Sequence, residues 1–257
     1  RLLDSKSIKT LYIGGGTPSA LSTDQLSELC QAVAHQWPDI QEWTVEINPD
    51  DMTFEKMVIL TKFGVNRLSM GVQATQSRLL DIITRHHTFE DVKKVTDWAH
   101  ECGIEDISYD LMYGLPTQTI EEFEISMREV LALNPTHCSL YALTIEPNTT
   151  FGRQKIQPVD NELEGKMYEC AVTTFTQAGY EHYEVSSFTR NKHYSKHNLS
   201  YWKYKNFIGL GPGAASKVNN RRWTNTKNIH HYTIGEKLIQ EDIQLSEDDQ
   251  VIEKLMM

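Results

Sequence analysis

The feature that most constrains the fold of this chain is the alternation of short apolar segments with helical segments through its first 150 residues. The apolar segments are rich in β-branched and aromatic residues, which predicts strands at 10–14, 43–47, 67–72, 107–113 and 139–145. Strands separated by helical crossovers run parallel, so this order requires a parallel β-sheet covered by helices. The chain is therefore predicted to be of the α/β class.

The predicted helices carry start and stop signals. Ser22 and Thr119 are each followed three residues later by a Gln or a Glu, which is the spacing of a capping box. Thr53 and Thr88 are further expected N-caps. Glycines that follow helical segments are expected C-terminal stops, at Gly64, Gly103 and Gly179.

The pattern changes after residue 160, where we expect a helix at 162–178 and a strand at 180–188. A further strand is expected at 207–216, running into a glycine-rich loop. Periodicity does not decide whether the parallel sheet is open and doubly wound or closed, fully or in part, into a barrel. A helix that begins at Asp248 has no C-cap, and the start at Arg1 has neither an initiator Met nor a signal peptide, so truncation at both ends is expected.

Composition narrows the choice of partners. The formal net charge of -10 argues against a nucleic-acid binder, because phosphate contacts need a clustered excess of Lys and Arg. No segment reaches the roughly 18 uninterrupted apolar residues of a membrane span. The four cysteines stand too far apart for a C-x-x-C signature and are expected to pack as small apolar side chains of a cytosolic protein, at Cys30, Cys102, Cys138 and Cys170.

A glycine-rich turn, Gly14-Gly15-Gly16-Thr17-Pro18, directly follows the first predicted strand. Three glycines let a ligand approach the backbone, whose N–H and C=O groups can bind an ammonium, a carboxylate or a phosphate. The turn is neither a dinucleotide fingerprint nor a P-loop, because G-x-G-x-x-G and Gly-Lys-Ser/Thr are both absent. Taken alone, it fits a simple tight turn as well as a binding loop.

Polar side chains stand at the carboxyl ends of the next strands, where ligands bind in parallel sheets. Glu46, Gln73 and Asp110 would face one cleft beside the glycine-rich turn if their strands are neighbours. A carboxylate and an amide suit the two hydroxyls of a ribose, and Glu46 suits an ammonium. Arg85 suits a carboxylate. Each of these residues alone also fits an ordinary loop or surface ion pair.

As an ordered set, these segments resemble the radical-SAM family that contains oxygen-independent coproporphyrinogen III oxidase. The matching segments are Gly14-Gly15-Gly16-Thr17-Pro18, Glu46 with Asn48-Pro49, Ser69-Met70-Gly71-Val72-Gln73, Arg85, and Asp110-Leu111-Met112-Tyr113-Gly114-Leu115-Pro116. The resemblance implies a partial (β/α)6 barrel with a mixed C-terminal extension. Residues 1–160 would form the barrel core without its first strand and cluster loop. Residues 161–257 would complete the barrel and begin the C-terminal region.

The resemblance also implies a binding site for S-adenosylmethionine (SAM). Its methionine end would meet Gly15, Gly16 and Thr17, with Glu46 nearby and Arg85 at the carboxylate. Gln73 and Asp110 would hold the ribose, and the adenine would be bordered by Tyr141, Thr144 and Ala215. The family's [4Fe–4S] cluster is held by a C-x-x-x-C-x-x-C motif upstream of the glycine-rich turn. That motif is absent from this sequence, so the fragment is expected to be unable to begin radical chemistry.

A later segment resembles the H-N-x-x-Y-W motif of haem chaperones in this family rather than its oxidases. Its candidate haem-binding residues are His197, Asn198, Tyr201 and Trp202, with His197 as a possible iron ligand. Histidine can ligate haem iron, and Tyr and Trp can stack on a porphyrin. Taken without the resemblance, His197 also fits a structural or merely exposed residue.

Three hypotheses follow. In the first, the intact protein binds haem, uses SAM and a cluster, and passes haem to an acceptor protein in the cytoplasm. In the second, it is a coproporphyrinogen III oxidase that decarboxylates propionate side chains. In the third, the chain is an α/β domain that binds a different nucleotide without radical chemistry. Whether the protein is an enzyme and how its subunits associate stay open at this stage.

Overall fold

The computed structural model describes residues 8–257, so our expectation about the start at Arg1 lies outside the described residues. The chain divides between Tyr194 and Ser195 into two compact units. The predicted segment 161–257 spans both of them. Its residues 161–194 complete the first unit, and its residues 195–257 form the second.

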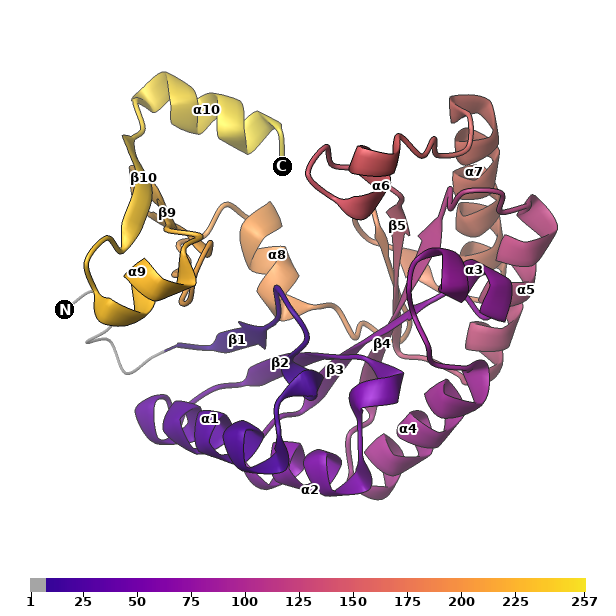
Figure 1. Cartoon of the computed structure of the whole chain (residues 1–257), viewed down its shortest axis with the longest axis horizontal. Coiled ribbons are helices and arrows are strands. Elements are labelled where there is room, and N and C mark those ends of the chain that lie inside the picture. The colour runs from indigo at the N-terminus through magenta and orange to yellow at the C-terminus, as the bar shows by residue number, and fades with distance from the viewer. Residues whose placement is uncertain (1–7) are drawn as a thin grey trace. The chain divides into compact units, whose positions relative to one another are not determined.

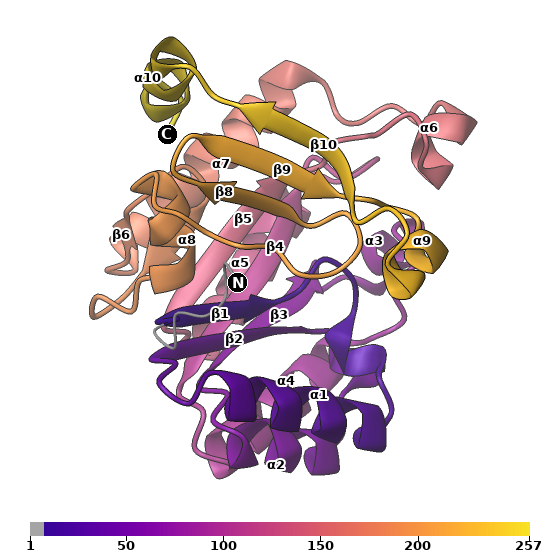
Figure 2. The same ribbon diagram turned by 90° about the vertical axis from the view of Figure 1, so that its left-hand side faces the viewer.

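The first unit is built on a curved, mostly parallel sheet (Figures 1 and 2). Its five parallel strands lie in chain order: β1 (Thr10–Ile13), β2 (Glu42–Ile47), β3 (Arg67–Gln73), β4 (Asp106–Tyr113) and β5 (His137–Ala142). Two short antiparallel strands extend it beyond β5, namely β7 (Ser187–Thr189) and then β6 (Glu181–His182). Within residues 8–257 no pairing joins β1 to β6, so the sheet is a partial barrel, as predicted.

Helices cover the outer face of this sheet (Figure 1). They are α1 (Thr23–Gln36), α2 (Phe54–Lys62), α4 (Phe89–Glu101), α5 (Ile120–Ala132) and α7 (Asn161–Gln177). Shorter elements follow the carboxyl ends of strands: the 3-10 turns η1 (Pro18–Ala20) and η2 (Pro49–Asp51), and the helices α3 (Ser77–Ile82) and α6 (Thr150–Gln154). One continuous apolar core fills the space between sheet and helices, including Leu26, Met57, Leu68, Val92 and Phe123.

The inner face of the sheet is polar, and strand β4 shows why. Successive side chains of a strand point to opposite faces. Ile107, Tyr109 and Leu111 belong to the apolar core, whereas Ser108 and Asp110 alternate with them and hydrogen-bond to each other. The sequence of β4 therefore places one carboxylate on the inner face, close to the carboxyl end of the sheet.

The expected helix ends are confirmed. Ser22, Thr88 and Thr119 each close a capping box, and the Thr53 hydroxyl accepts a hydrogen bond from the Lys56 N–H. The three predicted stop glycines adopt the positive φ that such turns need: Gly64, Gly103 and Gly179.

Replacing Thr88 by Ala is expected to lower the free energy of unfolding by about 1 kcal/mol, because the first turn of α4 loses its side-chain cap. Thr173→Ala is the matched control, since that hydroxyl donates to the Glu169 carbonyl oxygen within its own helix and caps no helix end. Urea titration of both variants measures the difference. Equal stability of the two variants would show that the cap contributes nothing.

Three expected strands are wrong in extent. The strand predicted at 180–188 is interrupted between β6 and β7, where the Glu184 carboxylate accepts a hydrogen bond from the Ser186 N–H and the chain reverses. Most of segment 207–216 is loop, because Gly211 and Gly213 adopt positive φ, and the strand β8 begins only at Ala215. The strand predicted at 139–145 begins earlier and ends at Ala142, the last residue paired with β4.

The second unit contains a three-stranded antiparallel sheet, in agreement with the mixed extension we expected (Figure 2). Its strands are β8 (Ala215–Val218), β9 (Arg221–Asn225) and β10 (Ile239–Gln244). Its helices are α8 (Lys196–Trp202), α9 (Ile229–Ile234) and α10 (Glu247–Leu255). The last of these begins one residue before the expected start and is capped by Ser246.

The four cysteines are unpaired thiols that pack in or against the apolar core of the first unit, as predicted. Burial raises the pKa of the Cys30 thiol to about 11, so this thiol stays protonated at neutral pH. Over residues 8–257, no helix has both the length and the apolar composition that crossing a membrane requires.

Candidate functional site

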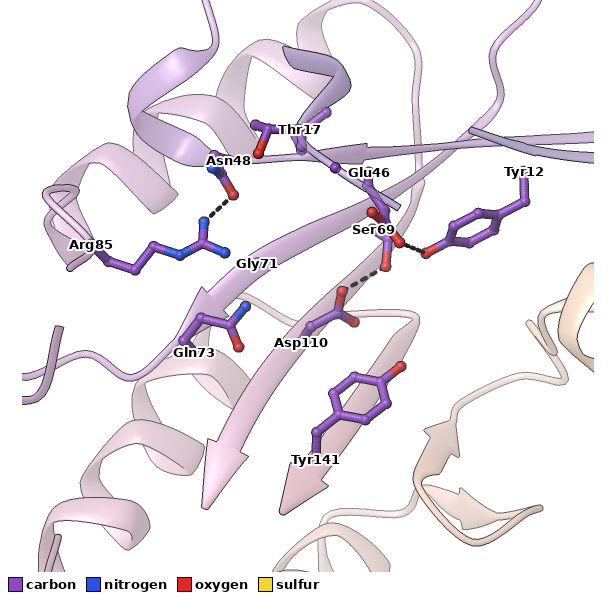
Figure 3. A pocket seen from close by; sticks show the side chains of 12 residues that line it. Tyr12, Thr17, Glu46, Asn48, Ser69, Gly71, Gln73, Arg85, Asp110 and Tyr141 are labelled. Carbon is purple, nitrogen blue, oxygen red and sulfur yellow. Dashed lines mark hydrogen bonds between the residues drawn. The ribbon is translucent and has the colours of Figure 1, made fainter. Parts of the chain in front are cut away.

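A pocket of about 220 Å³ lies on the inner face of the first unit, at the carboxyl ends of β1 to β5 (Figure 3). Parallel sheets bind ligands at this edge because the strand ends and the loops after them converge there. The pocket is lined by Tyr12, Gly16, Thr17, Glu46, Ile47, Asn48, Ser69, Gly71, Gln73, Arg85, Asp110 and Tyr141.

The Glu46 carboxylate is held on both oxygens. The Tyr12 hydroxyl donates to Oε1 at 2.9 Å, and the Gly15 N–H donates to Oε2 at 3.1 Å. The glycine-rich turn comes this close because residue 14 has no side chain. A Cβ at Gly14 would lie 2.4 Å from the Glu46 carboxyl carbon. The turn therefore positions a carboxylate, which is more than a simple reversal of the chain requires.

Asp110 lies at the floor of the pocket beside Ser69 (Figure 3). The Ser69 hydroxyl donates to Oδ2 at 2.6 Å, and the Ser108 hydroxyl donates to Oδ1 at 3.1 Å. Burial raises the pKa of Asp110 to about 6, although the serine hydroxyls oppose this change by stabilising the charged form. At pH 7 the Asp110 carboxyl is therefore mostly ionised and accepts hydrogen bonds.

Arg85 reaches the pocket from the loop between α3 and α4, and its Nη1 donates to the Asn48 side-chain oxygen (Figure 3). His87, which is only 3% exposed, ties this loop to β3 through a 3.0 Å contact between its Nε2 and the Val72 carbonyl oxygen. This contact fixes the loop two residues after Arg85, and the bond to Asn48 directs the guanidinium toward the pocket.

Gln73 ends β3 in a left-handed backbone conformation with φ of 63°, at a bulge between β3 and β4. Residues other than glycine rarely adopt this conformation, and such strain gathers at functional sites. A Cβ at Gly71 would lie 3.1 Å from Nε2 of Gln73, so the glycine leaves room for the amide. The bulge turns the Gln73 side chain toward Asp110 (Figure 3).

The pocket combines three kinds of polar group. Two carboxylates and a tyrosine hydroxyl suit an ammonium or a hydroxyl-bearing ligand, and a guanidinium suits a carboxylate. Among the described residues, the pocket offers one cationic side chain, that of Arg85. This set fits a zwitterionic ligand that also carries hydroxyl groups better than it fits a polyphosphate.

The structure brings most of the residues predicted for SAM to this pocket. Seven of them line it: Gly16, Thr17, Glu46, Gln73, Arg85, Asp110 and Tyr141. Gly15 stands beside them through its bond to Glu46. Thr144 is exposed, lies two residues after β5 and does not line the pocket. Ala215 begins β8 of the second unit.

Sequence reasoning missed other lining residues: Tyr12, Ile47, Asn48, Ser69 and Gly71. A signal was present for two of them, because Ser69 and Gly71 lie two residues apart on the strand predicted at 67–72, directly before Gln73. Tyr12 gave no such signal, since its role depends on how closely β1 and β2 pair.

The four residues predicted to bind haem lie together on α8 of the second unit. His197 Nε2 and the Tyr201 hydroxyl are 2.9 Å apart, and their rings meet edge to face. This contact follows from their i, i+4 spacing on one helix face. The Asn198 N–H donates to the Ser195 hydroxyl at the start of the helix, and Trp202 is its last residue.

No group of three His, Cys, Asp or Glu side chains in residues 8–257 is arranged to hold a metal ion. The cysteines stand on α1, after α4, on β5 and on α7, all in or against the apolar core. They do not fit a thiolate ligand set for an iron–sulfur cluster.

Comparison with known proteins shows the family to which the chain is related. The sequence pattern of the Radical SAM superfamily matches residues 1–130. The chain is 41% identical over 234 residues to the "heme chaperone HemW" of Bacillus subtilis (strain 168), covering 88% of this chain and 61% of that protein. It is 37% identical to the protein of the same name from Lactococcus lactis subsp. lactis (strain IL1403), covering 97% of this chain and 68% of that protein.

Among solved structures, the coproporphyrinogen III oxidase HemN of Escherichia coli, described as a radical SAM enzyme, superposes with a TM-score of 0.84 at 23% identity. The match covers 97% of this chain and 62% of that one, and at this identity it shows the shared fold. The chain thus spans about three-fifths of the length of the Bacillus relative. By the superfamily match and the extent of these identities, the chain belongs to the radical SAM superfamily and, within it, to the family of proteins named heme chaperone HemW.

Proposed function

We propose that the pocket binds SAM and that the chain is the SAM-binding body of a protein that binds haem and passes it to an acceptor protein in the cytoplasm. The observation that carries the first part is the placement of Glu46, Arg85 and Asp110 around one cavity at the carboxyl ends of neighbouring strands. The names of the relatives support the second part. Four unpaired thiols agree with a reducing compartment.

The methionyl group and the ribose of SAM would each find partners of matching chemistry in the pocket. Glu46 would accept from the ammonium of the methionyl group, and Arg85 would pair with its carboxylate. Asp110 and Gln73 would bind the ribose hydroxyls. Tyr141 lies on the neighbouring strand β5, two residues beyond the residue paired with Asp110, and would border the adenine.

The protein's own contribution in this proposal is binding and orientation. In the superfamily, SAM supplies a 5′-deoxyadenosyl radical after an iron–sulfur cluster reduces it. The cysteines of this chain do not fit such a cluster, so we assign no chemical step to these residues. Glu46 and Asp110 are both fixed by hydrogen bonds. In the proposal they hold the methionyl ammonium and the ribose of the ligand in fixed positions.

The relatives favour haem transfer over oxidation of coproporphyrinogen III. The proteins with 41% and 37% identity are named for haem chaperoning, whereas the oxidase shares 23% identity and so shows the fold alone. In the proposal, His197 of α8 ligates haem iron, and Asn198, Tyr201 and Trp202 form the rest of the haem site.

A haem titration of the full chain tests this assignment. We expect a saturable change of the haem absorption band and tighter binding of haem than of metal-free protoporphyrin, because only haem offers iron to His197. The His197→Ala variant should lose the difference between haem and the metal-free porphyrin. His230→Ala, an exposed histidine on α9, is the control and should keep it.

Binding of haem and metal-free porphyrin with equal affinity in the unaltered chain would contradict iron ligation. Tighter binding of coproporphyrinogen III than of haem would favour the oxidase reading instead.

A further inference from the structure

A chain of buried polar contacts runs from the floor of the pocket into the interior of the first unit. Ser108 Oγ lies 3.1 Å from Oδ1 of Asp110 and 2.8 Å from Nδ1 of His137. On the other side of the imidazole, Nε2 lies 2.8 Å from the Tyr183 hydroxyl. Of these residues only Asp110 lines the pocket, so the others would act on a ligand through it.

The sheet register produces this chain. Ser108 of β4 is paired with His137 of β5, and Asp110 is paired with Ser139 two residues further along. Because side chains alternate between faces, all four point to the inner face of the sheet. His137 is 1% exposed and Ser108 is 3% exposed, so water does not compete for their hydrogen bonds.

The chemistry of the groups fixes the direction of each hydrogen bond. An ionised carboxylate only accepts, so the single hydroxyl hydrogen of Ser108 points to Asp110. Ser108 Oγ must then accept from His137, which places the imidazole hydrogen on Nδ1. Burial, followed by the nearby Arg67 charge, holds the pKa of His137 well below its usual value, so the ring is neutral and Nε2 accepts from Tyr183.

This arrangement gives the buried His137 its hydrogen-bond partners and also restrains the Asp110 carboxylate. Ser108 holds Oδ1 while Ser69 holds Oδ2, so both oxygens of the carboxylate are fixed and its plane is set. If the imidazole hydrogen were on Nε2 instead, Nδ1 would accept from Ser108 and draw the hydroxyl hydrogen away from Asp110. Ser139 Oγ lies 3.2 Å from Ser108 Oγ and also stabilises the charged Asp110 carboxyl by a hydrogen bond. The state of His137 therefore determines whether Ser108 contributes its own hydrogen bond to Oδ1 of Asp110.

We propose that His137 is a positioning residue for the pocket: its Nδ1 hydrogen orients the Ser108 hydroxyl, which holds the Asp110 carboxylate ready to accept from the hydroxyls of a ribose. The ligand class is a ribonucleoside with both the 2′- and 3′-hydroxyls. This inference deepens the proposed function and rests on it, since Asp110 is the group assigned to the ribose of SAM.

Two substitutions separate positioning from packing. In His137→Asn the side-chain amide nitrogen takes the place of Nδ1 and donates to Ser108, whereas in His137→Gln the amide lies near the place of Nε2 and that donor is lost. The probes are SAM, adenosine and 2′-deoxyadenosine, titrated calorimetrically into the full chain. The readout is the ratio of the affinities for adenosine and 2′-deoxyadenosine.

We expect the unaltered chain and His137→Asn to prefer adenosine, and His137→Gln to bind SAM about fivefold more weakly and lose most of that preference. A packing role would lower the melting temperature of both variants and leave the ratio unchanged. Ser108→Ala removes the same link with a smaller buried change, and we expect the same loss of preference. It gives the answer if His137→Gln fails to fold.

The outcomes distinguish the two proposals. If the unaltered chain binds SAM and prefers adenosine, but Ser108→Ala and His137→Gln keep the full preference, the positioning role is overturned and the SAM site stands. If the unaltered chain prefers adenosine but does not bind SAM, and His137→Gln and Ser108→Ala lose that preference, the proposed function fails while the role of His137 is retained. Equal binding of adenosine and 2′-deoxyadenosine by the unaltered chain overturns the positioning role.

Discussion

The Asp110→Asn variant is expected to bind SAM about 10- to 100-fold more weakly than the unaltered chain. A hydrogen bond to a charged group contributes about 1.5 to 3 kcal/mol, and each 1.4 kcal/mol corresponds to roughly a tenfold change in affinity. The Asn side chain has nearly the same size, but it exchanges one accepting oxygen for a donor that faces Ser69 or Ser108. Isothermal titration calorimetry of the full chain measures the change.

Asp97→Asn is the matched control, because it makes the same chemical change on the exposed face of α4. It should leave the affinity for SAM within twofold of the unaltered chain, which is roughly the error of such a comparison. If Asp110→Asn bound SAM as tightly as Asp97→Asn, the ribose would not be bound at Asp110.

The Gly14→Ala variant is expected to weaken SAM binding by about tenfold or more, with only a small loss of stability. The new methyl group would lie 2.4 Å from the carboxyl carbon of Glu46, so the carboxylate has to swing away. It would then lose the bonds from Tyr12 and Gly15 and leave the place assigned to the ammonium of SAM. The flexible side chain can move, so the fold itself is retained.

Gly165→Ala controls for the chemical change at glycine. Apart from the chain neighbours and the backbone of α7 itself, no atom of residues 8–257 lies within 4 Å of a Cβ at this position. Alanine stabilises a helix interior by roughly 0.5 to 1 kcal/mol relative to glycine. Calorimetry gives the affinity, and thermal unfolding gives the stability of both variants. Unchanged SAM affinity in Gly14→Ala would mean that the placement of Glu46 is not needed for binding.

The fold class could be predicted because local signals and the global arrangement agree. Thr88 and Thr119 mark helix starts through capping boxes, each of which needs only four consecutive residues. In β4, apolar and polar residues alternate, as expected for a strand with one face in the apolar core and the other in a polar site. Segment 207–216 misled us because its apolar residues look like a strand. Its glycines adopt positive φ instead, and the local sequence does not reveal that choice.

The candidate site could be predicted in part, for a related reason. Polar residues at strand ends, such as Glu46 and Asp110, meet in any parallel sheet, so their positions in sequence already place them at one edge. Tyr12 and the buried pair of Ser108 and His137 depend on register between strands, which the sequence does not specify. The sequence therefore did not reveal the inner-face residues whose contacts depend on the pairing of neighbouring strands.

The central claim is that SAM occupies the pocket at the carboxyl ends of the parallel strands. The most direct measurement is an amide NMR titration of the isotope-labelled full chain with SAM. We predict saturable shifts of the Gly15, Gly16 and Gln73 amides, with the outer helix α1 unaffected. A titration in which these amides do not shift, while SAM binds elsewhere or not at all, would contradict the account.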